Sequence, residues 1–98
     1  NMVNMEKLWL TNAGIKDIDS LSEMVNLEEL VLYGNEIEDV SPLKSLTKLK
    51  VLKLGDNLIE DVSPLSGLTN LTELSLWDNP IKDTTPLENL TETEIQLN

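Results

Sequence analysis

One pattern of residues returns every 22 positions along this chain of 98 residues. Leucine occurs at Leu30, Leu52 and Leu74, and the residues that follow each of them also agree. The other shared positions are Leu32, Leu54 and Leu76; Asn35, Asn57 and Asn79; Ile37, Ile59 and Ile81; Asp39, Asp61 and Asp83; and Pro42, Pro64 and Pro86. Such a unit buries its apolar side only against its neighbours, so the repeat constrains the fold more strongly than any local propensity.

The repeated unit reads L-x-L-x-x-N-x-I-x-D-V-S-P-L-x-x-L-T-x-L. It resembles the leucine-rich repeat, in the 22-residue form of the bacterial internalins. The resemblance implies an α/β solenoid, in which a curved parallel sheet of about five short strands carries short 3₁₀ or α turns on its convex side. It also implies that a protein partner binds the concave face, as in internalin-like proteins.

The repeat divides the whole chain without leaving room for a second domain. We expect a single leucine-rich repeat domain over residues 1–98, with a partial repeat at 1–7, repeats at 8–29, 30–51, 52–73 and 74–95, and the start of a further strand at 95–98. The first and fourth units are the least regular, and the fourth is one residue short.

Each unit predicts a strand, a turn and a short helix. Residues around L-x-L alternate between apolar and variable, which is the period of a strand with one buried face. This predicts strands near 7–11, 29–33, 51–55, 73–77 and 95–97. Proline after Ser41 and Ser63 predicts helix starts that those serine side chains cap. The asparagines at Asn35, Asn57 and Asn79 are expected to form a ladder that satisfies the peptide groups of the turns.

The composition argues against catalysis and against several ligand classes. The chain has no cysteine and no histidine, so we expect no enzyme activity, no cofactor and no metal site. Asp39, Asp61 and Asp83 recur with the fold and are expected to bond to turn or helix-start amides. A net charge of −11 disfavours nucleic acid, and no apolar run is long enough to predict membrane insertion.

The three aromatic residues of the chain, Trp9, Tyr33 and Trp77, all fall on outward positions of the predicted strands. Exposed tryptophan and tyrosine supply large contact area and are enriched at the centres of protein interfaces. Decoration of a solvated sheet is the alternative interpretation. We therefore expect a partner-binding surface on the concave face, made by Trp9, Thr11, Glu29, Val31, Tyr33, Lys53, Asp56, Ser75, Trp77 and Asp78.

Apolar residues at both ends of the array lack a neighbouring repeat in this sequence. Met2, Met5 and Leu8 lie at one end and Ile95 and Leu97 at the other, which makes end-to-end self-association a hypothesis. The resemblance favours a cell-surface or secreted protein. The alternatives are an intracellular adaptor similar to the leucine-rich regulatory subunits of phosphatases, and a structural or engineered repeat with no partner of its own.

Overall fold

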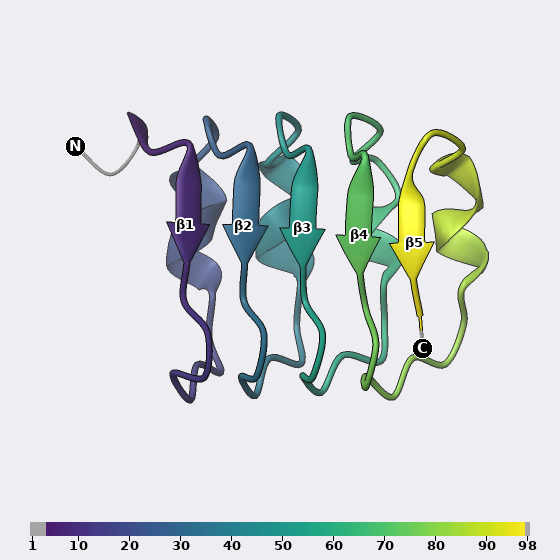
Figure 1. Ribbon diagram of the computed structural model, residues 1–98, viewed down its shortest axis with the longest axis horizontal. Helices are drawn as coiled ribbons and strands as arrows, with labels where there is room; N and C mark the ends of the chain where they lie inside the picture. The colour runs from purple at the N-terminus through teal and green to yellow at the C-terminus, as the bar shows by residue number, and fades with distance from the viewer. Residues whose placement is uncertain (1–3, 98) are drawn as a thin grey trace.

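Five short parallel strands lie side by side in one sheet, and a 3₁₀ helix follows each of the first four (Figure 1). The computed structural model describes residues 4–97, so the expectations for Met2 and Asn98 lie outside the described residues. The strands and helices alternate along the chain. The elements are β1 (Lys7–Trp9), η2 (Asp19–Glu23), β2 (Glu29–Val31), η3 (Ser41–Ser45), β3 (Val51–Lys53), η4 (Ser63–Leu65), β4 (Glu73–Ser75), η5 (Thr85–Asn89) and β5 (Glu94–Gln96).

The sheet follows the chain in order from β1 to β5, so every strand pairs with the strand of the next repeat. Leu8 pairs with Leu30, and Leu30 pairs in turn with Leu52, in the register that the repeat predicts. Leu74 pairs with Ile95, because the last turn of the coil contains one residue fewer. This is the leucine-rich repeat solenoid that the sequence predicts.

The first four strands are shorter than the sequence predicts, at three residues instead of five, and β5 has the predicted three residues but begins at Glu94 instead of residue 95. The regular strand stops because the chain turns through a left-handed conformation three residues later, as at Gly34 (φ 71°) and Asp56 (φ 57°). Glycine, asparagine and aspartate tolerate this region best. Backbone hydrogen bonds nevertheless continue between repeats up to the turn, where the Asp56 amide donates to the Trp77 carbonyl over 2.8 Å.

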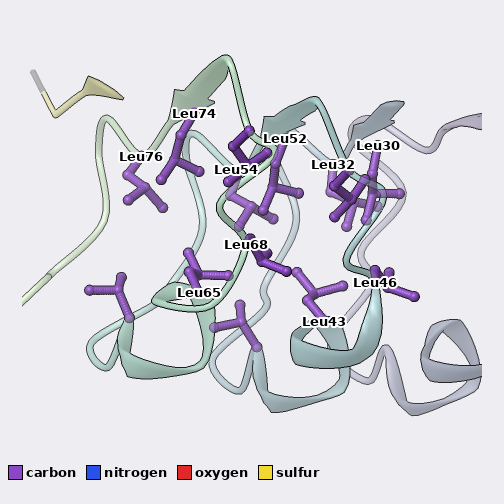
Figure 2. Close-up of a cluster of buried hydrophobic side chains, with 14 of the residues drawn as sticks. Leu30, Leu32, Leu43, Leu46, Leu52, Leu54, Leu65, Leu68, Leu74 and Leu76 are labelled. Atoms are coloured by element: carbon purple, nitrogen blue, oxygen red, sulfur yellow. The ribbon is translucent and has the colours of Figure 1, made fainter. Parts of the chain in front are cut away.

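The core is a continuous stack of leucines between the sheet and the helices. The strand leucines point toward the leucines of the helical segments, and successive repeats interlock along the row (Figure 2). Leu30, Leu32, Leu52, Leu54, Leu74 and Leu76 are fully buried, as are Leu43, Leu46, Leu65 and Leu68. At the two ends, Met5, Leu8 and Ile95 pack against this core but are only partly buried. End-to-end association therefore stays a prediction.

Three buried or half-buried asparagines bond each turn of the coil to the turn before it. Asn57 Oδ1 accepts from the Ile37 amide at 3.1 Å, and its Nδ2 donates to the carbonyls of Leu32 and Leu54, both at 3.0 Å. Asn35 and Asn79 make the equivalent contacts. An unsatisfied buried polar group costs about 1–3 kcal/mol, so each amide stabilises two neighbouring repeats at once.

The helix starts are held by aspartate instead of the expected serine. Asp39 Oδ1 accepts from the Ser41 amide at 2.9 Å, and Asp61 and Asp83 accept likewise from Ser63 and Thr85. No serine hydroxyl caps η3 or η4, so the predicted cap by Ser41 and Ser63 is wrong. A carboxylate two residues upstream reaches the first amide as an Asx turn, which leaves the serine inside the helix.

We expect the Leu54→Ala variant to lose about 2–5 kcal/mol of unfolding free energy, because the side chain is fully buried and its removal leaves a cavity. Urea denaturation followed by circular dichroism measures this loss. Leu58→Ala is the matched control, since Leu58 is 46% exposed, and its cost should stay within about 0.5 kcal/mol. Equal losses in both variants would contradict the assignment of the core.

We also expect acid to weaken the helix starts. Backbone hydrogen bonds hold the pKa of Asp39, Asp61 and Asp83 below the ordinary 3.8, with a smaller contribution from the Ser41, Ser63 and Thr85 hydroxyls. Because the folded-state pKa is depressed, the stabilisation is complete above the unfolded value and is lost as the pH falls through the folded value. Replacing all three with asparagine keeps an acceptor oxygen but removes this titration.

Denaturation midpoints measured from about pH 5 down to about pH 2 should therefore fall more steeply for the unmodified chain than for the triple asparagine variant. The matched control replaces Glu38, Glu88 and Glu92, all exposed, with glutamine. This control variant removes the same number of charges, and its denaturation midpoint should still fall steeply with decreasing pH. Parallel curves for the unmodified chain and the triple asparagine variant would contradict the prediction.

Candidate functional site

The side chains of the sheet that point away from the core form a surface that we call the open sheet face. Three columns of residues run across it, and each column takes one residue from each repeat. They are Lys7, Glu29, Val51, Glu73 and Glu94; Trp9, Val31, Lys53, Ser75 and Gln96; and Thr11, Tyr33, Gly55 and Trp77. The alternation of the strands therefore brings most of the predicted contact residues to one surface.

A shallow depression of about 320 Å³ lies on this face. Two aromatic residues, two valines and charged side chains from neighbouring strands line it together. Its lining is Trp9, Glu29, Val31, Tyr33, Val51, Lys53 and Glu73. Sequence reasoning missed Val51 and Glu73, although both follow from extending the column of Glu29 to the next two repeats.

Two polar contacts join residues that line the depression. The Trp9 indole N–H donates to Glu29 Oε2 at 2.7 Å, which holds a ring that is 67% exposed beside a carboxylate. Lys53 Nζ lies 3.1 Å from Glu73 Oε2. The hydrogen bond to Glu73 raises the pKa of Lys53, with smaller contributions from Tyr33, so this lysine remains a cation whose charge is already matched.

Two of the predicted contact residues are buried. Ser75 is fully buried, and its hydroxyl donates to Gln96 Oε1 at 2.9 Å, so the expectation that it contacts a partner is wrong. Val31 is 8% exposed and lines the depression, where its neighbours cover it. Strand alternation predicts the direction of a side chain but does not show whether a side chain of the next repeat covers it.

The remaining predicted contact residues are accessible to different degrees. Thr11 is exposed, and Asp56 and Asp78 are exposed on the left-handed turns at the end of the strands. Trp77 and Tyr33 are half-buried because their rings contact one another across a repeat, with centroids 5.3 Å apart and planes inclined by 34°. The aromatic residues of the open sheet face are thus one exposed indole and one packed pair.

Comparison with a family model identifies the repeats. The model described as "Leucine Rich repeats (2 copies)" matches residues 3–45 and again 47–89. The chain belongs to the leucine-rich repeat family. A search of curated proteins found no match.

Solved structures place this leucine-rich repeat protein among internalin-like chains. It is similar to internalin inlF of Listeria monocytogenes, with 41% identity and a TM-score of 0.94 over 97% of this chain and 28% of that one. It is also similar to Listeria monocytogenes internalin C2, with 39% identity and a TM-score of 0.95 over 98% of this chain and 43% of that one. A leucine-rich repeat protein of Leptospira interrogans matches at 27% identity and a TM-score of 0.83, over 96% of this chain and 26% of that one. The chain therefore spans less than half the length of each of these proteins.

The described part of the leucine-rich repeat chain contains neither a metal-binding cluster nor a membrane-spanning helix. Within residues 4–97, no three or more acidic side chains gather in a way that could hold a metal ion. None of the helices in the same range has the length and apolar character needed to cross a membrane. The depression and the aromatic residues beside it are accordingly the candidate site.

Gly55 is the residue that makes the aromatic pair possible. It occupies the column of Tyr33 and Trp77, between the two, and a Cβ atom placed on it would overlap the Trp77 ring. Its backbone does not require glycine, because Gly55 is not among the residues with positive φ. The missing side chain is instead the space through which Trp77 reaches Tyr33. The repeat spacing also places Gly55 in this column, but the sequence alone gave no reason to assign it a role.

We expect Gly55→Ala to displace the Trp77 ring and separate it from Tyr33. In a Trp9→Phe background, where Trp77 is the only tryptophan, its fluorescence emission should shift to the red as the ring becomes more hydrated. The loss of the aromatic contact should lower the unfolding free energy by about 1 kcal/mol.

Gly67→Ala in the same background is the matched control, because a Cβ atom on Gly67 meets nothing within 4 Å. It should leave the emission of Trp77 unchanged and the stability equal or slightly higher. An unchanged emission in the Gly55 variant would contradict the proposed packing.

Proposed function

We propose that this chain is a non-catalytic scaffold that binds a protein partner through the open sheet face, as part of a bacterial surface or secreted protein. The leucine-rich repeat is a type of protein-interaction scaffold, and the internalin resemblance supports the bacterial setting. The observation that carries the proposal is the 67% exposure of Trp9 beside a depression on the sheet.

The open sheet face differs from the helical side in its side chains. All three aromatic residues of the chain lie on the open sheet face, whereas η3 and η5 expose Lys44, Ser45, Glu88 and Asn89. Tryptophan and tyrosine bring large apolar area with few rotatable bonds, so holding them in place on binding costs little entropy. The Tyr33–Trp77 contact restricts both rings before a partner arrives, which lowers this cost further.

The proposed contact residues are those that the structure leaves accessible. Trp9 and the Tyr33–Trp77 pair are the anchors, with Glu29 and Lys53 between them. Thr11, Asp56 and Asp78 extend the surface toward the left-handed turns. Because the sheet has five strands about 4.8 Å apart, the face covers only a few hundred Å², and the anchors must supply most of the binding energy.

Photo-crosslinking tests which face meets a partner. A benzophenone amino acid at Thr11, exposed on the open sheet face, should crosslink one defined protein when incubated with surface and secreted proteins of bacterial and host cells. The same amino acid at Lys44, exposed on η3, is the matched control and should give no such product. Adding Trp77→Ala should reduce the yield at Thr11 several-fold.

Two results of the crosslinking experiment would contradict the proposed function. One is an equal product from Lys44 and Thr11, which would place the contact elsewhere or show that it is non-specific. The other is a Thr11 product whose yield does not respond to Trp77→Ala. Circular dichroism of each variant checks that the repeats are intact before the yields are compared.

A further inference from the structure

The depression beside Trp9 is lined by a carboxylate, Glu29, that forms no ion pair with a lysine within residues 4–97. Within residues 4–97, four lysines form ion pairs, and their partners are Glu36, Glu28, Glu73 and Glu60. Glu29 is not among these partners, and its hydrogen bond comes from the neutral Trp9 indole. Among the described residues, Glu29 therefore lines the depression without an ion-pair partner, although Lys7 lies opposite it in the strand register.

The surroundings of Glu29 have the form of a socket for a long side chain that ends in a cation. The half-buried Val51 offers apolar surface to a methylene chain, and Trp9 and Tyr33 also line the depression. Aromatic rings attract a cation, and partial burial strengthens its attraction to a carboxylate. Lysine and arginine have this combination of apolar stem and charged head.

The charge around the depression also favours a basic partner. The open sheet face and its turns carry five carboxylates, Glu29, Asp56, Glu73, Asp78 and Glu94, against two lysines, Lys7 and Lys53. The chain as a whole has a net charge of −11. Complementary potentials guide association and suppress acidic partners, so a basic surface approaches this face most readily.

We propose that the depression receives an arginine or lysine side chain of the protein partner, with Glu29 pairing with its charge and Trp9 covering its stem. This inference rests on the proposed function and adds the chemistry of the contact. It assigns distinct roles to two carboxylates of one column. Glu29 faces the partner, whereas Glu73 is occupied by Lys53 within the chain.

Small probes test the depression separately from any partner. Nα-acetyl-arginine amide and Nα-acetyl-lysine amide carry the proposed group, and Nα-acetyl-norleucine amide has a similar stem without charge. Two indole N–H signals are present in a ¹⁵N-labelled sample, and Trp9→Phe and Trp77→Phe variants assign them. We expect the arginine and lysine probes to shift the Trp9 signal saturably, and the norleucine probe to shift it far less.

Variants identify the groups responsible. Glu29→Gln keeps an oxygen that can accept from Trp9 but removes the charge, and it should weaken arginine-probe binding about three- to fivefold. Glu88→Gln, an exposed residue of η5, is the matched control and should leave binding unchanged. Added salt should weaken binding of the arginine probe and leave binding of the norleucine probe nearly constant.

Several results would overturn the inference. These are no shift of the Trp9 signal up to the solubility limit of the charged probes, equal binding of the norleucine probe, or unchanged arginine-probe affinity in Glu29→Gln. The crosslinking experiment reports on the whole face and does not depend on these probes. Crosslinking at Thr11 together with a failed titration would therefore overturn this inference and leave the proposed function standing.

Discussion

The first three turns of this solenoid each form hydrogen bonds with the asparagine of the turn that follows. The Asn57 side-chain amide accepts a hydrogen bond from the Ile37 amide and donates to the Leu32 carbonyl, both one repeat earlier. It also donates to the Leu54 carbonyl within its own repeat. The buried leucines interlock across the same boundary, so apolar burial and hydrogen-bond satisfaction depend on the same neighbour. A single repeat cannot fold alone under this constraint, and the parallel register of the sheet is a consequence of it.

The open sheet face depends on this internal regularity. Because the strand leucines point into the core, the residues beside them point outward in straight columns, and residues 22 positions apart become neighbours. The core positions leave the outward positions free to vary, and Trp9, Tyr33 and Lys53 occupy such positions. The left-handed turns at Gly34, Asp56 and Asp78 end β2, β3 and β4 at the same level, which keeps the columns aligned.

The fold was predictable from the sequence because one period determines it. The spacing of Leu30, Leu52 and Leu74 is enough to predict the strand order and most of the register, and the pairing of the strands agrees with it. The helix caps were assigned to the wrong residue, because the S-P pattern does not distinguish a serine cap from an aspartate that reaches forward from two positions upstream. Periodicity identifies which residues share an environment, whereas side-chain reach decides which of them bond.

The candidate site was predictable only in part, and for the same reason. Alternation placed the aromatic residues on the correct face, but it could not show that Gln96 covers Ser75 or that Trp77 crosses Gly55 to reach Tyr33. These contacts join side chains of different length from different repeats. Because Trp77 extends across Gly55, the arrangement of side chains on the open sheet face depends on residues from adjacent repeats together. Duplication or exchange of a single repeat would separate the Trp77 ring from the space above Gly55 that accommodates it. We therefore expect adjacent repeats of such proteins to change together.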